Sequence, residues 1–526
     1  MRCAPCQAGG AGRVYRSMST RSATTAFALA RRPLRAVPLV ALVALVALLA
    51  PAAGAHRAVG ASSVRTTVAG TPRGIALGFM DEGVTAFVNP ADTATALVRA
   101  RQAGASVWGL VIRWASVSPT RPPSLADARN PDWSGYDWSS TDSAVRAIST
   151  AGMQTLAVVY VAPQWAEGPT RPSLSVAPAG TWDPSATSLG AFATALARRY
   201  SGTFVDPTAP GSDLPAIRDW EPWNEPNLGV FLTPQWKRAS GRYQAVSPGI
   251  YRGLLNAFYA GVKAVAPTDT VAAGTTAPFG DPPGGSRIPP ALFWRDLLCV
   301  TAGAHTVSTH CGAHVHFDAI SHHPYPIGPP TYHAINADDV TVPDLGKITR
   351  LIPIAERAGT VLPNGPKPLW ITEISWESPP DPNGLSFASQ ALYLEGAIDV
   401  LYHEGASMFI WFNLRDEPLN PPAYTNLQSG VYSRGATPGR DVAKPSLTAY
   451  EFPFTAYRDN GFARLWGMAP TAGPVAIEEH DGTKWVTVST LVATKTRIFS
   501  GSLLVGPRTR LRAVSGTSVS LAWTTS

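Results

Sequence analysis

The sequence predicts an α/β protein made of a (β/α)8 TIM barrel followed by a small C-terminal β-domain. Short apolar, β-rich runs alternate with longer stretches of helical period between residues 74 and 457. Eight such strand–helix units can be counted, and eight units over roughly 380 residues fit a barrel with loop insertions. A doubly wound open sheet would instead carry a Gly-rich phosphate loop after its first strand, and this sequence has none there.

The expected barrel strands alternate with helices that end at glycine. Gly104, Gly152 and Gly405 stand where a left-handed residue would end a helix before the next strand. The expected helices include 91–103, 187–200, 250–265 and 386–404. The expected strands are 75–81, 107–114, 154–162, 217–225, 270–277, 317–325, 367–376 and 406–414.

The last segment, 458–526, has a different pattern. Its short β-branched runs, 484–492, 496–499 and 508–513, are separated by Gly, Pro and Ser and predict strands. Because so short a segment has a limited core of its own, we expect it to pack against the barrel rather than to bind carbohydrate independently.

Residues 1–55 have the features of a secretory leader, and 56–73 are expected to form a linker. The leader holds seven arginines and no acidic residue, and its apolar run from Ala36 to Ala50 precedes the small-x-small sequence Ala53-Gly54-Ala55. That run is shorter than the roughly 20 residues a membrane span needs, although an uncleaved N-terminal anchor is the alternative. We therefore expect a secreted protein, or one held at the cell exterior by its leader.

The net charge limits the expected binding partners, and the cysteine content indicates a possible disulfide. The formal net charge is +7, and the seven leader arginines account for it, so the exported part is near neutral. Neither nucleic acid nor, after leader cleavage, a membrane is an expected partner, and the oligomeric state is not indicated. Of four cysteines, Cys299 and Cys311 lie in the exported part, where a disulfide is expected and two buried free thiols are the alternative.

Two glutamates stand at the C-terminal ends of expected barrel strands, where TIM-barrel enzymes have their active sites. Glu225 ends the fourth strand and Glu373 lies near the end of the seventh, both among aromatic and apolar residues. Burying either charge without a partner would be costly, so a purely structural role needs a partner for each. As a pair they fit glycosidic bond cleavage, in which one carboxyl group protonates the leaving oxygen and the other attacks the anomeric carbon.

The motifs around these glutamates resemble clan A glycoside hydrolases, most of all family 39 and related family 5-like enzymes, over about 75–455. The resemblance implies a retaining enzyme without cofactor, with Glu225 as acid/base and Glu373 as nucleophile. The motifs are Trp220-Glu221-Pro222-Trp223-Asn224-Glu225-Pro226-Asn227, His323-Pro324-Tyr325-Pro326 and Thr372-Glu373.

The same resemblance implies residues that contact a carbohydrate substrate. Asn224 would bond the 2-hydroxyl of the sugar, and His323 and Tyr325, which share one strand face, would line the site and orient the carboxylates. Trp411 on the eighth strand matches the aromatic platform beneath the sugar, and Trp165 after the third strand is a second stacking candidate.

One expected residue is missing from the second strand. Clan A enzymes usually carry there an arginine, five residues before a tryptophan, that helps to hold the nucleophile, and here Gly109 has that spacing before Trp114. Arg113 has the same strand parity but lies about 13 Å higher, so it is expected only to contact substrate.

We expect the protein to hydrolyse O-glycosyl bonds in a polysaccharide or glycoconjugate. The resemblance implies that these are β bonds. A transglycosylase and a non-catalytic glycan-binding barrel are the alternatives, and the missing arginine favours the latter. No metal site is expected, because one histidine-rich segment lacks a known ligand spacing. Its members are His305, His310, Cys311, His314, His316, His322 and His323.

Overall fold

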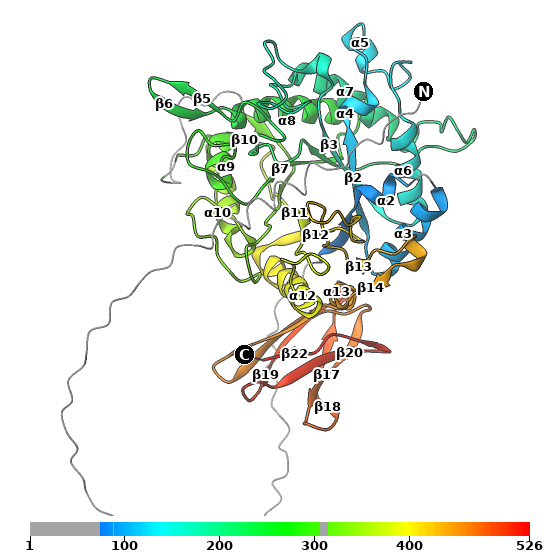
Figure 1. Ribbon diagram of the computed structural model, residues 1–526, viewed down its shortest axis with the longest axis vertical. Coiled ribbons are helices and arrows are strands. Elements are labelled where there is room, and N and C mark those ends of the chain that lie inside the picture. The colour runs from blue at the N-terminus through cyan, green and yellow to red at the C-terminus, as the bar shows by residue number, and fades with distance from the viewer. Residues whose placement is uncertain (1–73, 88, 302, 304–313, 526) are drawn as a thin grey trace, which may run out of the picture.

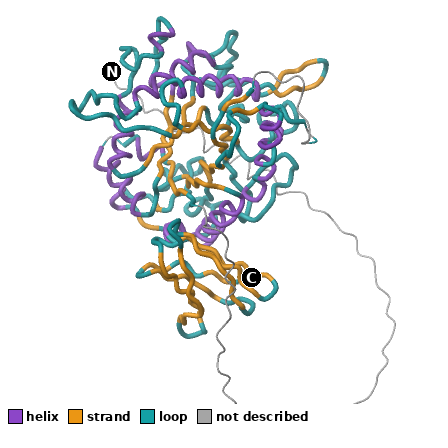
Figure 2. The backbone as a smooth tube through the Cα atoms, turned by 180° about the vertical axis from the view of Figure 1, so that it is seen from behind, coloured by secondary structure: helices purple, strands orange, loops and turns teal. Residues whose placement is uncertain are grey.

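A computed structural model describes residues 74–87, 89–301, 303 and 314–525. Eight parallel strands close into a barrel in the order β1-β12-β11-β9-β7-β4-β3-β2, which confirms the predicted fold (Figures 1 and 2). Each predicted strand contains one of them. They are β1 (Ala76–Met80), β2 (Val107–Arg113), β3 (Gln154–Tyr160), β4 (Asp219–Pro222), β7 (Thr270–Thr276), β9 (Ala319–His322), β11 (Leu369–Ile374) and β12 (Ala406–Phe412).

Helices surround the barrel, and their ends follow the capping residues in the sequence. The Asn89 and Ser386 side chains accept hydrogen bonds from backbone N–H groups at the starts of α3 and α12. Gly405 has a φ of 108° and ends α12 as predicted. The longer helices are α3 (Pro90–Gln102), α6 (Ser139–Thr150), α7 (Ala186–Arg199), α8 (Ser247–Lys263), α9 (Pro290–Leu298), α11 (Ile352–Arg357), α12 (Phe387–Glu404) and α13 (Pro445–Glu451).

The strand register separates side chains that face the barrel interior from those that face the helices. Val111, Val158 and Glu221 pair across β2, β3 and β4, so their side chains share one face. The preceding residue, Trp220, packs its ring on Phe258 of α8 with centroids 6.2 Å apart, so it faces outward. Because successive side chains of a strand alternate, Glu221 and its partners face the interior.

The C-terminal segment forms two antiparallel sheets over a shared apolar core. It begins earlier than the predicted residue 458, because β15 pairs with β16 along its whole length and so belongs to this unit. One sheet contains β15 (Phe454–Asp459), β16 (Phe462–Met468) and β19 (Ile498–Leu504). The other contains β17 (Gly473–His480), β18 (Trp485–Ala493), β20 (Arg510–Ser515), β21 (Ser518–Val519) and β22 (Trp523–Thr524).

This β-domain packs against α12, as Figure 1 shows. Asp399 of α12 is buried, accepts a hydrogen bond from the Thr455 hydroxyl at 2.8 Å and pairs with Arg464 at 2.9 Å. One helical turn earlier, Glu395 is fully buried, and among the described residues neither of its carboxyl oxygens has a hydrogen bond of ordinary geometry. Burial raises the pKa of Glu395 well above its usual value, although the backbone N–H of Phe454 partly opposes this shift.

We predict that Glu395→Gln stabilises the protein at neutral and alkaline pH. A carboxyl group whose pKa is higher in the folded state contributes stability that is complete below its unfolded pKa and is lost as the pH rises toward the folded value. Over that interval wild type should lose about 1.4 kcal/mol per pH unit relative to the variant. Denaturant unfolding at acid and alkaline pH measures the difference. Glu479→Gln, at a partly exposed site in β17, is the matched control, and an equal difference at both pH values would contradict the prediction.

Three predictions concern residues outside the described ranges. The leader (1–55) and the linker (56–73) lie there, and so does Cys311. Cys299 is disulfide-bonded, while its pairing with Cys311 stays a prediction. Within the described ranges, no helix combines the length and the apolar character needed to cross a bilayer.

Candidate active site

Glu225 lies just beyond the end of β4 in a strained backbone segment. Trp223 and Glu225 have φ values of 75° and 37°, in the left-handed region that residues with a side chain adopt at a cost. The segment is held by hydrogen bonds from Glu225 N to Thr275 O at 3.1 Å and from Trp223 Nε1 to Phe231 O at 2.8 Å. Such strain is characteristic of functional sites, and here it accompanies a buried carboxyl group that lies 3.0 Å from His323 Nδ1.

Glu373 lies on β11, where the pairing with β12 is irregular. The register shifts between Ile371 and Ile374, so Glu373 falls in a bulge at the C-terminal end of the strand. The phenolic O–H of Tyr325 donates a hydrogen bond to Glu373 Oε2 at 3.2 Å. Bulges redirect side chains, and this one places the carboxyl group opposite Glu225.

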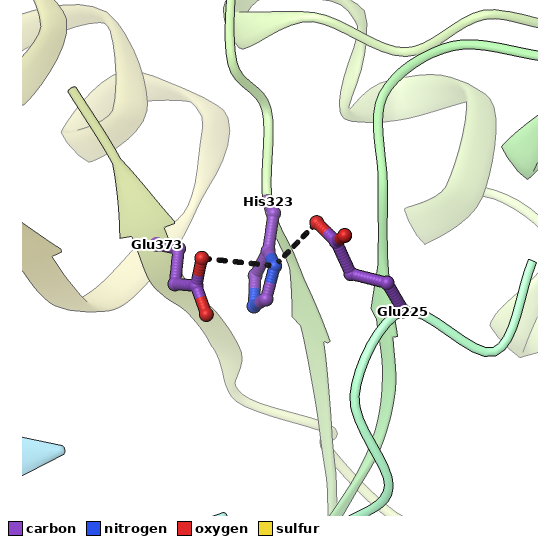
Figure 3. Close-up of side chains that lie close together, drawn as sticks. All are labelled: Glu225, His323 and Glu373. Atoms are coloured by element: carbon purple, nitrogen blue, oxygen red, sulfur yellow. Dashed lines mark hydrogen bonds and ion pairs between the residues drawn. The ribbon is translucent and has the colours of Figure 1, made fainter. Parts of the chain in front are cut away.

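His323 lies between the two carboxyl groups (Figure 3). Its Nδ1 is 3.0 Å from Glu225 Oε1 and 3.8 Å from Glu373 Oε2, and its Nε2 is 3.1 Å from Thr372 Oγ1. One oxygen of each glutamate and a nitrogen of the histidine lie within 4.8 Å of one another. The structure therefore brings together four predicted site residues, Glu225, Glu373, His323 and Tyr325.

The environment separates the proton affinities of the two carboxyl groups. Burial raises the pKa of Glu225 well above its usual value, and the charge of Glu373 raises it further. Burial also raises the pKa of Glu373, to about 8, but here the hydrogen bond from Tyr325 favours the carboxylate. Burial lowers the pKa of His323 well below its usual range, so the ring is neutral. As a pair, Glu225 retains its proton longer and Glu373 ionises first.

The Met80 side chain packs against Gly109 on the inner face of β2, where the resemblance leads one to expect an arginine. Gly109 pairs with Met80 of β1, and a Cβ atom at position 109 would lie 2.6 Å from Met80 Cε. The Met80 side chain thus occupies the space that a longer residue at 109 would need. The polar groups beside Glu373 that the described contacts identify are Tyr325 and His323, a phenol and a neutral imidazole.

Three further candidates lie around the ends of the strands. Asn224 is buried next to Glu225 in the sequence. Arg113, at the end of β2, pairs with Glu82 at 2.5 Å, and both side chains are partly exposed. Trp165 is partly buried, donates from Nε1 to Ser118 O at 2.9 Å and so has a fixed ring. Their roles as substrate contacts stay predictions.

Trp411 does not face the site, which corrects the expectation that it forms a platform beneath a sugar. It pairs in register with Phe79 of β1, and Phe79 stacks on Tyr450 of α13 at 4.4 Å on the outer face of the barrel. The Trp411 side chain is fully buried. The next residue, Phe412, pairs with Met80 and faces the interior. A one-residue shift along a strand reverses the face, and the motif did not define the register.

Two inward-facing residues escaped the sequence reasoning. Glu221 is part of the quoted motif but received no role, and Thr372 was read only as the neighbour of Glu373. Strand alternation offers a signal for Glu221, since it follows the outward-facing Trp220. The contact of Thr372 with His323 joins two strands and had no signal in the sequence.

The group Glu225, His323 and Glu373 is also the one set of three candidate metal donors among the described residues. The other described histidines of the segment lie elsewhere: His314 Nδ1 donates to Gly359 O, His316 packs on the Tyr259 ring, and His322 bonds Thr276 Oγ1 and Val340 O. His305, His310 and Cys311 are outside the described ranges.

We predict that dialysis against a chelator leaves activity unchanged. Both carboxyl groups have a raised pKa, whereas a cation would need them ionised, and both ring nitrogens of His323 already have partners. Turnover of an aryl glycoside before and after dialysis against EDTA measures the effect. A loss that added Zn²⁺ or Mn²⁺ restores would contradict the prediction.

Several solved structures that are similar to this chain are named as glycoside hydrolases. A family 39 glycoside hydrolase from Bacteroides cellulosilyticus WH2 has 18% identity, covers 82% of this chain and 81% of its own, and has a TM-score of 0.49. A family 39 β-xylosidase from Caulobacter crescentus has 15% identity, coverages of 82% and 96%, and a TM-score of 0.44. The family 30 xylanase C from Talaromyces cellulolyticus has 13% identity, covers 83% of this chain and 98% of its own, and has a TM-score of 0.43.

No protein-family model and no curated protein matches the chain.

Proposed function

We propose that this protein is an exported, retaining glycoside hydrolase that cleaves O-glycosyl bonds through double displacement. The bonds that we expect it to cleave are β bonds. The observation that carries the proposal is the pair of buried carboxyl groups at the ends of β4 and β11, whose nearest oxygens are within 4.8 Å. Retaining enzymes place their carboxyl groups about 5–5.5 Å apart, and inverting enzymes leave about 6.5–9.5 Å for a water molecule.

The order of the two pKa values supports the roles. In the first step the acid must hold a proton and give it to the leaving oxygen while an ionised carboxylate attacks the anomeric carbon. Glu225, which holds its proton to the higher pH, suits the acid role, and Glu373 suits the nucleophile. In the second step Glu225, now ionised, accepts a proton from water while that water releases the sugar from Glu373.

Export is supported by the leader-like composition of residues 1–55, with seven arginines ahead of an apolar run. The substrate proposed is a polysaccharide, oligosaccharide or glycoconjugate. A transglycosylase would use the same two carboxyl groups, with a sugar hydroxyl in place of water in the second step.

The stereochemistry of the first product tests the proposal. We predict that the sugar released from an aryl β-glycoside has the β configuration before it mutarotates, because two inversions at one carbon give net retention. Proton NMR of the anomeric signal in the first minutes of reaction measures it, after a screen of aryl glycosides has found a substrate. An α product would exclude double displacement, and a larger yield of oligosaccharide on addition of acceptor sugar would identify a transglycosylase.

A further inference from the structure

Glu221 is a third carboxyl group inside the barrel, on the inner face of β4 and closer to the strand's N-terminal end than Glu225. Its side chain is fully buried, and among the described residues neither carboxyl oxygen has a hydrogen bond of ordinary geometry. A buried carboxylate without such bonds is costly, and burial raises the pKa of Glu221 to about 8. At neutral pH Glu221 is therefore a carboxylic acid that can donate a hydrogen bond as well as accept one.

The polar neighbours of Glu221 are two hydroxyl groups. Those of Ser321 and Thr372 lie close enough to oppose the rise in its pKa, though burial outweighs them. Ser321 Oγ already accepts a hydrogen bond from Thr275 N at 3.1 Å. Thr372 Oγ1 is also 3.1 Å from Nε2 of His323, so the hydroxyl group near Glu221 contacts the ring between the two proposed catalytic carboxyl groups.

The hydrogen bonds of His323 depend on which nitrogen carries the proton. The ring is neutral, so one nitrogen donates and the other accepts. Nδ1 faces oxygens of Glu225 and Glu373. A hydrogen on Nδ1 can therefore be donated to whichever of these groups is ionised. Nε2 must then accept the single hydroxyl proton of Thr372.

Glu221 decides whether that proton is available. An ionised Glu221 would be a strong acceptor and would take the hydrogen bond of the Thr372 hydroxyl group. Nε2 of His323 would then carry the ring hydrogen and donate to Thr372. Nδ1 would face the two carboxyl groups without a hydrogen. A neutral Glu221 can donate to Thr372 and leaves that proton for His323. Other charges near Glu221 act in the same direction: Asp219 raises its pKa, and a charge on Glu221 would raise those of Glu373 and Tyr251.

We propose that Glu221 is a positioning residue that holds His323 in the Nδ1–H tautomer through Thr372. Its consequence for catalysis rests on the proposed function: the Nδ1–H group would stabilise Glu225 as a carboxylate in the second step without competing for the acid proton in the first.

Nitrogen NMR of ¹⁵N-histidine-labelled protein tests the tautomer without any need for turnover. The measurement uses the Glu373→Gln variant, so that only Glu225 of the two carboxyl groups facing Nδ1 can still titrate, and His323→Asn identifies the signals. We expect His323 to be protonated on Nδ1 below the pKa of about 8 and to shift to Nε2 above it. Glu221→Gln, which is neutral at every pH and keeps a donor and an acceptor, should abolish that shift. A single tautomer throughout, or a shift that persists in Glu221→Gln, would overturn the proposal.

Kinetics give a second readout and separate this proposal from the proposed function. In the otherwise unchanged enzyme, Thr372→Val should lower kcat about tenfold at an unchanged KM, the scale of one lost hydrogen bond. Thr372→Ser, which keeps the hydroxyl, should restore it. Equal kcat values for Thr372→Val and wild type would count against the linkage. If wild type has no glycosidase activity the proposed function fails, and the NMR result still decides the tautomer.

Discussion

Glu373→Ala is expected to lose turnover by about 10⁴-fold or more, because without a nucleophile no glycosyl-enzyme can form. Glu373 lies in the β11 bulge, with Tyr325 and His323 as neighbours, and the carboxyl group within 4.8 Å of it, that of Glu225, is proposed as the acid/base. Steady-state hydrolysis of an activated aryl glycoside measures the loss. Glu479→Ala in the β-domain is the matched control and should retain wild-type activity.

Two measurements show whether the lost group was the nucleophile. A 2-deoxy-2-fluoro glycoside should label Glu373 in wild type, and peptide mass mapping would locate the label. Azide should rescue Glu373→Ala by attacking the anomeric carbon from the vacated side, which gives a glycosyl azide of inverted configuration. Sugar binding without labelling or turnover would instead favour a non-catalytic glycan-binding barrel, the alternative that the Gly109 position supports.

Glu225→Gln is expected to slow substrates with poor leaving groups by about 10²–10⁴-fold, the usual contribution of a general acid. Substrates whose leaving group needs no proton should still form the glycosyl-enzyme at nearly the wild-type rate. They should then accumulate it, because water has lost its general base. Kinetics with aryl glycosides of graded leaving-group pKa measure the difference, and azide should here give a product of retained configuration. Equal slowing of all substrates would contradict the assignment.

The pH profile of this variant follows from the same assignment. Glu373 must be ionised, so kcat/KM of wild type should fall as the pH drops through about 8. Glu225 must be protonated, so activity should also fall at higher pH, where its raised pKa is reached. Glutamine cannot lose a proton in this range, so the variant should keep the acid limb and lose the alkaline one.

Sequence patterns predicted the barrel strands well because their signal is local. Except for β4, whose residues are Asp-Trp-Glu-Pro, each barrel strand is a short and mainly apolar run between turn residues. The end of the barrel was misplaced for a similar reason: β15 begins at Phe454 with residues as apolar as a barrel strand, and only its pairing with β16 assigns it to the β-domain.

The site was predicted less evenly. The motifs predicted Glu225, Glu373, His323 and Tyr325 as site residues, and the structure brings them together because parallel strands bring their ends together. Trp411 was misassigned, since strand parity depends on a register and a bulge that only inter-strand pairing reveals. The occupation of the Gly109 space by Met80 likewise depends on two strands being adjacent.

By itself the sequence determined the kind of fold, the pair of carboxyl groups and their order along the chain, because apolar periodicity and residue chemistry are properties of local segments. Only the tertiary structure decided the pKa values of those groups, and so which of them is protonated at a given pH. Burial raises the pKa of Glu225, Glu373 and Glu221 together, and a neutral His323 links two of them across strands. Proton affinity depends on what surrounds a group in space, and a linear sequence does not contain that information.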